Sequence, residues 1–246
     1  MSSSLVGKRI VVTRPADQAE SFCAELEALG AEAIRLPVIR TECLNDPGLL
    51  DQALRTLNNY DWVVFTSVNG VRHALERLEG PFPETVKVAA IGPATEKALE
   101  DRGVRCAFVP EEYVAEHIAS GLTAVRGAHI LLLRAVTARK ALGEQLRCRG
   151  AYVEEVPAYR TVAVRPSLNR LRAAVDAITF TSSSTAQEFH ALVGTHTRHL
   201  DTAIIACIGP ITASAARELG YTVDVVARPY TTGGLLRALE QYFATR

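Results

Sequence analysis

An internal repeat constrains the fold of this chain more than any other feature of its sequence. Residues 11–14 (Val-Val-Thr-Arg) align with residues 131–134 (Leu-Leu-Leu-Arg), and residues 37–41 align with residues 157–161, both at an offset of 120 residues. A match over 31 residues at one fixed offset is not expected by chance. The chain is therefore predicted to consist of two similar structural units.

Two further pairs of segments extend the repeat. Residues 65–67 (Phe-Thr-Ser) match residues 180–182, and residues 91–95 (Ile-Gly-Pro-Ala-Thr) match residues 208–212 (Ile-Gly-Pro-Ile-Thr). Each pair places the same polar or glycine-containing turn after an apolar run. The two units are therefore expected to carry equivalent turns at equivalent places.

Short apolar runs alternate with longer amphipathic segments along the chain. This alternation is typical of parallel sheets built from right-handed strand-helix-strand crossovers, and it predicts an α/β protein with two doubly wound, flavodoxin-like sheets. The expected strands are 9–13, a strand from 33 to 37, 61–66, 86–91 and 104–108, and the expected helices are 16–29, 68–78, 93–102 and 111–122, before a further cycle starts at residue 128.

Two assemblies of the repeat are compatible with the residues alone. A plain tandem would divide the chain near residue 124. In the alternative, the chain crosses between domains at the equivalent segments 37–41 and 157–161, so that residues 41–160 form an inserted domain and residues 1–38 with 163–246 form the other. The linker strands would then lie near 37–41 and 157–163.

Charge and cysteine content exclude several classes of protein. The 27 basic residues balance 27 acidic ones among 246 residues, whereas a nucleic-acid-binding protein more often carries a basic excess. No signal peptide and no membrane-spanning stretch is expected. The five cysteines show no metal or redox spacing, and we expect them to be reduced thiols, mostly in the core, of a cytoplasmic protein.

Polar residues at the ends of predicted strands are the candidates for a binding site. In open α/β sheets, ligands bind beyond the carboxyl ends of strands, where unpaired backbone N–H groups at helix starts attract carboxylates. Ser67, Asn69, Ser182 and Ser183 occupy such places, but each is also a suitable helix N-cap. Matched sets in both units favour a ligand shared between them.

Three other residues have both a functional and a structural interpretation. Arg14 and Arg134 end equivalent strands, where each is suited to hold a carboxylate through two hydrogen bonds or to form a salt bridge. Tyr159 stands where the first repeat has Ile39, and it is suited either to donate a proton to a ligand or to pack at the crossing.

Several common sites are not predicted. The chain has no glycine-rich nucleotide fingerprint and no Gly-x-Ser-x-Gly nucleophile motif. His190, His196 and His199 lie close in sequence, but their spacing does not suit a metal site. These motifs therefore predict neither a metal site nor a binding site for NAD or ATP.

Taken in order, the motifs resemble those of the uroporphyrinogen-III synthase family over essentially the whole chain. The resemblance is carried by Val-Thr-Arg-Pro at 12–15, Phe-Thr-Ser-Val-Asn-Gly-Val at 65–71, Ala-Ile-Gly-Pro-Ala-Thr at 90–95, Ala-Tyr-Arg-Thr at 158–161, Ile-Thr-Phe-Thr-Ser-Ser at 178–183, Cys-Ile-Gly-Pro-Ile-Thr at 207–212 and Pro-Tyr-Thr-Thr-Gly-Gly-Leu at 229–235. Each motif is short, and their order and spacing give the specificity.

This resemblance implies an architecture and a reaction. It implies the inserted-domain topology, with two α/β domains joined by a two-stranded linker. The implied substrate is hydroxymethylbilane, a linear tetrapyrrole with eight carboxylates. The enzyme, a lyase without a cofactor, would remove the terminal hydroxyl as water and close the ring through a spiro intermediate, with the last pyrrole inverted. Such proteins serve haem and sirohaem biosynthesis.

Specific residues follow from the same resemblance. Tyr159, similar to a tyrosine of the family, is expected to assist departure of the hydroxyl. The residues expected to contact the substrate are Arg14, Ser67, Val68, Asn69, Gly92, Thr95, Arg134, Ser182, Ser183, Gly209 and Thr212.

A binding or regulatory protein without catalysis is the competing class, because two α/β domains with a hinge also describe receptors that close on small molecules. We expect a monomer, since no apolar stripe is left unassigned after the sheets are covered. We also expect that the protein binds neither nucleic acid nor membrane. A transient contact with the preceding enzyme of the pathway is a further expectation.

Overall fold

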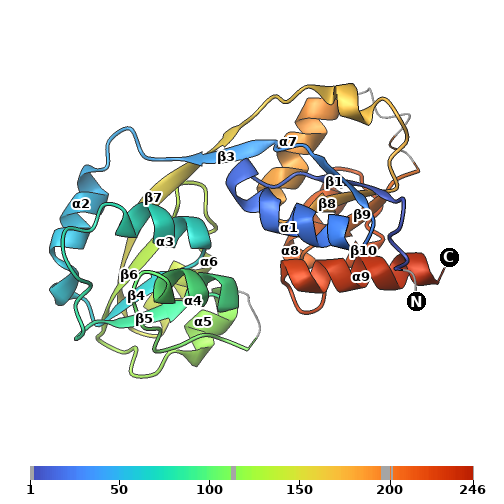
Figure 1. The fold of residues 1–246 in the computed structure, drawn as a ribbon. Coiled ribbons are helices and arrows are strands. Elements are labelled where there is room, and N and C mark those ends of the chain that lie inside the picture. Colours follow the sequence, from blue (N-terminus) through green and yellow to red (C-terminus); the bar gives the residue numbers. More distant parts are fainter. Residues whose placement is uncertain (1–2, 112–114, 195–199, 201, 246) are drawn as a thin grey trace. The chain divides into compact units, whose positions relative to one another are not determined.

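The computed structural model describes residues 3–111, 115–194, 200 and 202–245. The chain separates into two compact units, one formed by Met1–Arg40 with Val162–Arg246 and the other by Thr41–Thr161. Each unit is a mixed α/β structure with a five-stranded sheet in which parallel pairing dominates. Figure 1 shows helices packed on both faces of each sheet.

The first unit, which contains both chain ends, has the strand order β10-β9-β8-β1-β2. Its elements are β1 (Arg9–Val12), α1 (Ala16–Ala28), β2 (Glu32–Arg35), the 3₁₀ turn η2 (Leu168–Leu171), β8 (Ala177–Phe180), α7 (Ser183–Val193), β9 (Ile204–Cys207), α8 (Pro210–Glu218), β10 (Val225–Val226) and α9 (Thr232–Ala244).

The second unit has the strand order β3-β7-β6-β4-β5. Its elements are β3 (Ile39–Glu42), α2 (Gly48–Arg55), the 3₁₀ turn η1 (Leu57–Asn59), β4 (Trp62–Phe65), α3 (Val68–Leu75), β5 (Lys87–Ala90), α4 (Pro93–Glu100), α5 (Ala115–Gly121), β6 (His129–Ala135), α6 (Ala141–Cys148) and β7 (Tyr152–Ala163). The first residues of β3 and the last residues of β7 belong to the first unit by their contacts.

Equivalent strands of the repeat have equivalent neighbours. Strand β1 lies between β8 and β2, and its repeat partner β6 lies between β4 and β7. The registers match as well, because Val11 pairs with Ile178 and the equivalent Leu131 pairs with Val63. The two sheets thus contain the same arrangement, although the chain enters and leaves each at a different strand.

Alternating side chains of each sheet form two apolar layers. In the first unit, Val11 and Ile178 pack with α7 and α8 on one face. On the opposite face, Ile10 and Val12 pack with α1 and α9. Such near-continuous apolar strands are expected where helices cover both faces of a parallel sheet. The layers fix the strands, so their carboxyl ends form a rigid edge.

Some sequence predictions differ from the structure in detail. The strand expected at 104–108 is reduced to one isolated bridge between Ala89 and Phe108. The helix expected at 111–122 is described from Ala115, and residues 112–114 lie outside the described part. Helix α2 was not predicted, although Leu50, Ala53 and Leu54 on it are buried, whereas strand β3 overlaps the linker strand expected near 37–41.

The cysteines are less buried than we expected from their number and spacing in the sequence. All five are free thiols, but only Cys23 and Cys207 lie in the core, while Cys43 and Cys148 are exposed. The expectation of mostly core cysteines is therefore wrong. Within the part of the chain that the structure describes, no helix has both the length and the apolar content needed to cross a membrane.

Candidate active site

The carboxyl edge of the second sheet collects the residues predicted from the repeat. Ser67 follows β4 and caps α3, with its Oγ accepting a hydrogen bond from the Gly70 N–H at 3.0 Å. Gly92 caps α4 after β5, and Pro93 occupies the first turn of that helix. Because β5, β4, β6 and β7 are consecutive in the sheet, these turns and Tyr159 lie along one edge.

Tyr159 lies on β7, just beyond an irregularity in the pairing of β7 with β6. Its side chain is 7% exposed and packs in the apolar cluster that also includes Val63 and Phe65. The phenol oxygen lies 3.1 Å from Ser67 Oγ. A second hydrogen bond joins the phenol to the Asn69 side chain, so two residues of one helix start orient it.

The environment of Tyr159 determines its protonation. Burial raises the pKa of the phenol, and the hydrogen bonds with Ser67 and Asn69 and the charge of Arg72 lower it only in part. The free tyrosine titrates near pH 10, so the buried phenol keeps its proton at neutral pH. Tyr159 is therefore available as a hydrogen-bond or proton donor.

His73 supports the tyrosine and was not predicted from the sequence. Its ring stacks on the Tyr159 ring with centroids 5.5 Å apart and planes inclined by 15°. The Arg72 guanidinium lies 3.4 Å from His73 Nε2, and Thr41 Oγ1 lies 3.3 Å from the same nitrogen. Since arginine can only donate, Nε2 is the accepting nitrogen, and Nδ1–H then faces Cys43 Sγ at 3.6 Å.

The carboxyl edge of the first sheet carries the matching residues. Ser182 caps α7 and forms a capping box with Thr185, and Ser183 is the first residue of that helix. Gly209 caps α8, whose Thr212 is 5% exposed. The helix-cap interpretation of Ser67 and Ser182 is therefore correct, although a serine that caps a helix still presents its helix start to a ligand.

The two repeat arginines differ in their partners. Arg134, at the end of β6, is 8% exposed, and its guanidinium pairs with the Glu155 carboxylate and the Ala138 carbonyl. Its salt-bridge interpretation is therefore confirmed. Arg14, just after β1, donates one hydrogen bond to Gln18 Oε1 at 3.3 Å, while its Nε is buried without a partner in the described structure.

A small pocket lies beside this edge of the second unit. It measures about 150 Å³, and Thr66 and Arg134 contribute to its wall together with apolar side chains. Its other lining residues are Ile91, Leu132, Ala138, Arg139, Ala141 and Leu142.

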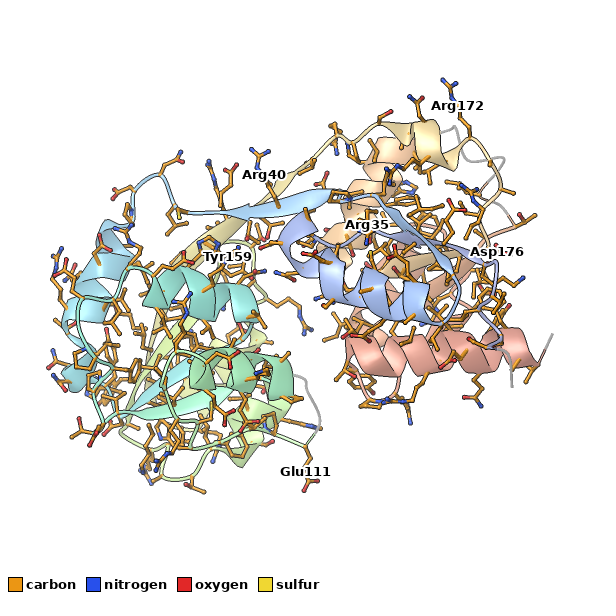
Figure 2. The ribbon with its side chains drawn as sticks, in the orientation of Figure 1. Arg35, Arg40, Glu111, Tyr159, Arg172 and Asp176 are labelled. Carbon is orange, nitrogen blue, oxygen red and sulfur yellow. The ribbon has the colours of Figure 1, made fainter. Side chains whose placement is uncertain are left out.

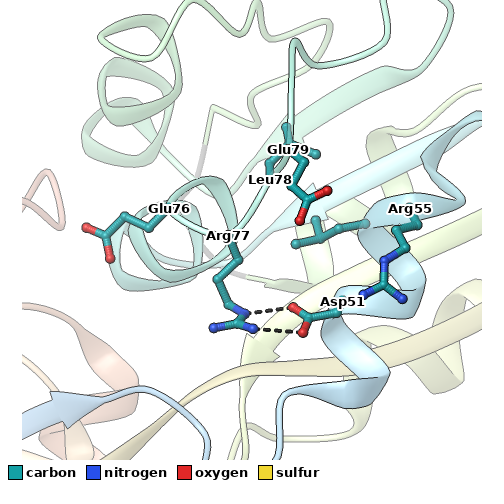
Figure 3. Close-up of a pocket in the computed structure, with 7 residues that line it drawn as sticks. Asp51, Arg55, Glu76, Arg77, Leu78 and Glu79 are labelled. Atoms are coloured by element: carbon teal, nitrogen blue, oxygen red, sulfur yellow. Dashed lines mark hydrogen bonds and ion pairs between the residues drawn. The ribbon is translucent and has the colours of Figure 1, made fainter.

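A larger pocket, of about 320 Å³, lies between α2 and the end of α3 and contains none of the predicted residues. Figure 3 shows that its Arg77 is held by two hydrogen bonds from the guanidinium to Asp51, each 2.7 Å long. Its wall contains three carboxylates and two arginines, so it offers no excess positive charge to a polyanion. The lining residues are Asp51, Leu54, Arg55, Glu76, Arg77, Leu78 and Glu79.

The remaining predicted residues have simple placements. Val68 is the exposed first residue of α3, and Thr95 lies 3% exposed in the first turn of α4. His190 lies on α7, where it packs against Tyr221, whereas His196 and His199 lie outside the described residues. Among the residues that are described, no three histidine, cysteine or acidic side chains gather as a metal site.

Comparison with known proteins identifies one family. The family described as uroporphyrinogen-III synthase HemD matches residues 20–237. A uroporphyrinogen-III synthase from Synechococcus elongatus is 33% identical over 97% of this chain and 96% of the relative. A putative uroporphyrinogen-III synthase from Methanothermobacter thermautotrophicus is 30% identical over 94% of this chain and 96% of the relative.

Solved structures share the fold. A mutant uroporphyrinogen III synthase from Thermus thermophilus superposes with a TM-score of 0.67 at 23% identity, covering 98% of this chain and all of the other. The corresponding protein from Helicobacter pylori has a TM-score of 0.61 at 18% identity, covering 97% of this chain and all of the other. These comparisons support the enzyme family and give no support to a binding protein without catalysis.

Proposed function

We propose that this chain, which belongs to the uroporphyrinogen-III synthase family, cyclises hydroxymethylbilane to uroporphyrinogen III with loss of water. The observation that carries the proposal is the buried, protonated Tyr159 phenol, held by Ser67 and Asn69 at the start of α3. A neutral phenol fixed in this way is suited to donate a proton to a departing hydroxyl group.

The first step is loss of the terminal hydroxyl. Tyr159 donates its proton to the hydroxyl oxygen, the bond from carbon to that oxygen breaks, and water leaves. The nitrogen lone pair of the adjacent pyrrole replaces the lost bond, which gives an azafulvene. The substituted carbon of the last pyrrole then attacks this methylene and forms a spiro intermediate.

Ring closure follows by fragmentation and recombination. In the spiro intermediate, the bond that originally joined the last pyrrole to the rest of the chain breaks, and this pyrrole turns over. The carbon on the other side of its ring nitrogen then attacks the released methylene carbon and closes the ring. A proton is lost from that carbon, which restores the proton taken from Tyr159. The overall loss is one water, so the reaction balances without an oxidant or reductant, and the enzyme is a lyase.

Recognition of the substrate rests on charge and helix starts. The substrate carries eight carboxylates, and helix starts with free N–H groups attract such anions. We assign the substrate contacts to Ser67, Val68, Asn69, Gly92 and Thr95 in the second unit. In the first unit, we assign them to Arg14, Ser182, Ser183, Gly209 and Thr212. Positioning is the main task, because the unguided substrate also cyclises without inversion.

The two sheets are consistent with circularly permuted, flavodoxin-like units. We propose that segments 37–41 and 157–163 form a two-stranded linker, with residues 41–160 as the inserted domain and residues 1–38 with 163–246 as the other. Val164, which directly follows the second segment, donates its N–H to the carbonyl of Val38 in the first segment at 2.8 Å, and this hydrogen bond supports the proposed pairing. We also expect a monomer, acting in the cytoplasm, where free thiols are stable.

An isomer assay tests the activity. Fresh hydroxymethylbilane is supplied to the protein, the products are oxidised, and type I and type III uroporphyrin are separated. We expect type III with the protein and type I in its absence. Only type I in both samples, from folded protein, contradicts the proposal.

The role of Tyr159 is tested by comparison with a second tyrosine of the same strand. Tyr159→Phe is expected to lower kcat by about 10²–10⁴, the usual effect of losing an acid catalyst. Tyr152→Phe is the matched control, because Tyr152 is 65% exposed at the other end of β7. Full turnover by Tyr159→Phe would remove the tyrosine from the mechanism.

A further inference from the structure

Arg72 links helix α3 to strand β3 close to Tyr159. Its Nη2 donates to Thr41 Oγ1 on β3 at 2.7 Å, and the same Nη2 lies 3.4 Å from His73 Nε2. Strand β3 is the neighbour of β7 in the sheet, and β7 carries Tyr159, which Figure 2 labels. Arg72 therefore ties the helix that orients the phenol oxygen to the strand beside the phenol ring.

These hydrogen bonds determine the protonation and the orientation of His73. The Thr41 hydroxyl accepts from Arg72, so its own proton can point to His73 Nε2, 3.3 Å away. Both of these neighbours then supply a proton to Nε2, and the proton of the imidazole lies on Nδ1, facing Cys43 Sγ. A protonated imidazole would place a second cation against Arg72, which is unfavourable. Arg72 and Thr41 therefore keep His73 neutral and in one tautomer.

The arrangement acts on Tyr159 in two ways. His73 is held at both ring nitrogens, so the plane on which the Tyr159 ring stacks, at 5.5 Å between centroids, is fixed. Burial raises the pKa of the Tyr159 phenol, and the charge of Arg72 is among the influences that lower it. A more acidic phenol gives its proton to a leaving group more readily.

We propose that Arg72 is a positioning residue of the reaction, which acts through His73 and Tyr159 and does not itself bind the substrate. This inference rests on the proposed function and goes beyond it, because Arg72 is outside the residues assigned to substrate contact. The carboxylates of the substrate would also be attracted to an arginine. The two roles differ in kinetics, since loss of a binding arginine raises KM, whereas loss of a positioning arginine lowers kcat.

The test is steady-state kinetics with hydroxymethylbilane. Arg72→Met removes the charge and the donors but keeps an unbranched stem, and we expect kcat to fall about tenfold with KM within about twofold, because small misplacements of a reacting group are costly. Arg72→Lys keeps the cation and a donor, and it should recover most of kcat. Thr41→Val removes the hydroxyl between Arg72 and His73 at nearly unchanged volume and should also lower kcat.

Two controls separate positioning from stability. Arg77→Met is the matched control, because Arg77 lies just beyond the end of α3 and donates two hydrogen bonds to Asp51, in the pocket between α2 and α3. It should leave kcat unchanged. In a Tyr159→Phe background, Arg72→Met should have little further effect on kcat, because the group through which Arg72 acts is then absent.

Nitrogen NMR of the histidine rings gives a readout that does not depend on turnover. The protein is labelled with ¹⁵N-histidine, and the signals of His73 are assigned by their absence from His73→Phe. We expect the neutral form with the proton on Nδ1 in the wild type and in Arg77→Met, and loss of this single form in Arg72→Met. A cationic His73 in the wild type at neutral pH, or a proton on Nε2, overturns the inference.

The outcomes distinguish this inference from the proposed function. If the wild type forms only type I product, the proposed function fails, and the inference fails with it. If the wild type forms type III product and Arg72→Met raises KM without lowering kcat, Arg72 binds the substrate and only the inference is wrong. The inference is also wrong if Arg72→Met lowers kcat equally with and without Tyr159. If Arg72→Met does not fold, Thr41→Val decides by the same criteria.

Discussion

The His73 imidazole lies flat against the Tyr159 phenol, with ring centroids 5.5 Å apart and an interplanar angle of 15°. Both side chains are almost fully buried, at 6% and 7% exposed. His73 comes from helix α3 and Tyr159 from strand β7, so the contact joins the helix start that holds the phenol oxygen to the strand that carries the ring.

Replacement of His73 is expected to lower turnover through Tyr159. His73→Ala removes the support of the phenol ring, and we expect kcat to fall about tenfold with KM little changed, because small misplacements of a reacting group are costly. His73→Phe retains a flat ring and should recover most of kcat. In a Tyr159→Phe background, His73→Ala should have little further effect on kcat. An equal loss in both backgrounds would show that His73 acts only on stability.

The carboxyl ends of the strands were predicted well from the sequence, because the repeat aligns equivalent strand ends in the two units. The offset that aligns Arg14 with Arg134 also gave equivalent strand ends, and Ser67 and Ser182 do cap helices there. The strand expected at 104–108 was wrong because one bridge, from Ala89 to Phe108, does not extend into a ladder. A short apolar run does not reveal whether backbone pairing continues.

Contacts distant in sequence were not predictable from the motifs. His73 is 86 positions from Tyr159, and nothing in the spacing indicates that their rings stack. Glu155, the ion-pair partner of Arg134, stands where the first repeat has Arg35, but the meaning of this difference required the register between neighbouring strands. Sequence patterns therefore located the candidate site, while packing decides which of its residues have partners.

Replacement of Ser67 is expected to affect stability and kcat, whereas replacement of its repeat partner Ser182, which we assign to substrate binding, is expected to affect stability and KM. Ser67→Ala removes the hydrogen bond that Ser67 Oγ accepts from the Gly70 N–H, and it also removes the contact of Ser67 Oγ with the Tyr159 phenol. Ser182→Ala removes the hydrogen bond that Ser182 Oγ accepts from the Thr185 N–H at the start of α7. Each should lower the free energy of unfolding by about 1 kcal/mol in urea denaturation. Only Ser67→Ala should also lower kcat substantially, and equal kcat values for the two variants would contradict the link to Tyr159.

The free energy of unfolding is expected to decline at alkaline pH because of Tyr60. Its phenol donates to Glu154 Oε2 at 2.6 Å, and burial together with this hydrogen bond raises its pKa to about 12. The unfolded tyrosine titrates near pH 10, so the folded state binds more protons than the unfolded state between these values. The stabilisation is complete below about pH 10 and is lost as the pH rises toward 12.

The matching measurement is urea denaturation at pH 9 and at pH 11 for the wild type and Tyr60→Phe. We expect the free energy of unfolding of the wild type to decline more steeply between the two values than that of the variant. Tyr221 also has a pKa raised to about 12 by burial, so Tyr221→Phe serves as a comparison. Identical declines in the wild type and Tyr60→Phe would show that Tyr60 does not contribute.

The ion pair of Arg134 with Glu155 predicts a stability effect that depends on which partner is removed. Glu155→Gln leaves a nearly enclosed arginine without its counter-ion, and we expect the free energy of unfolding to fall by about 2–4 kcal/mol. Replacing both partners together, as Arg134→Met with Glu155→Met, removes the buried charge as well as the pair and should cost less than Glu155→Gln alone.

Arg147 provides the matched control for this prediction, because it pairs with the other oxygen of Glu155 at 2.8 Å but is 44% exposed. Arg147→Gln should change the free energy of unfolding by about 0–1 kcal/mol, as is usual for an exposed pair. Urea denaturation of the four proteins distinguishes the cases. If Glu155→Gln is no more destabilising than Arg147→Gln, solvent reaches Arg134 more freely than its 8% exposure indicates, and its charge would then be available to a ligand.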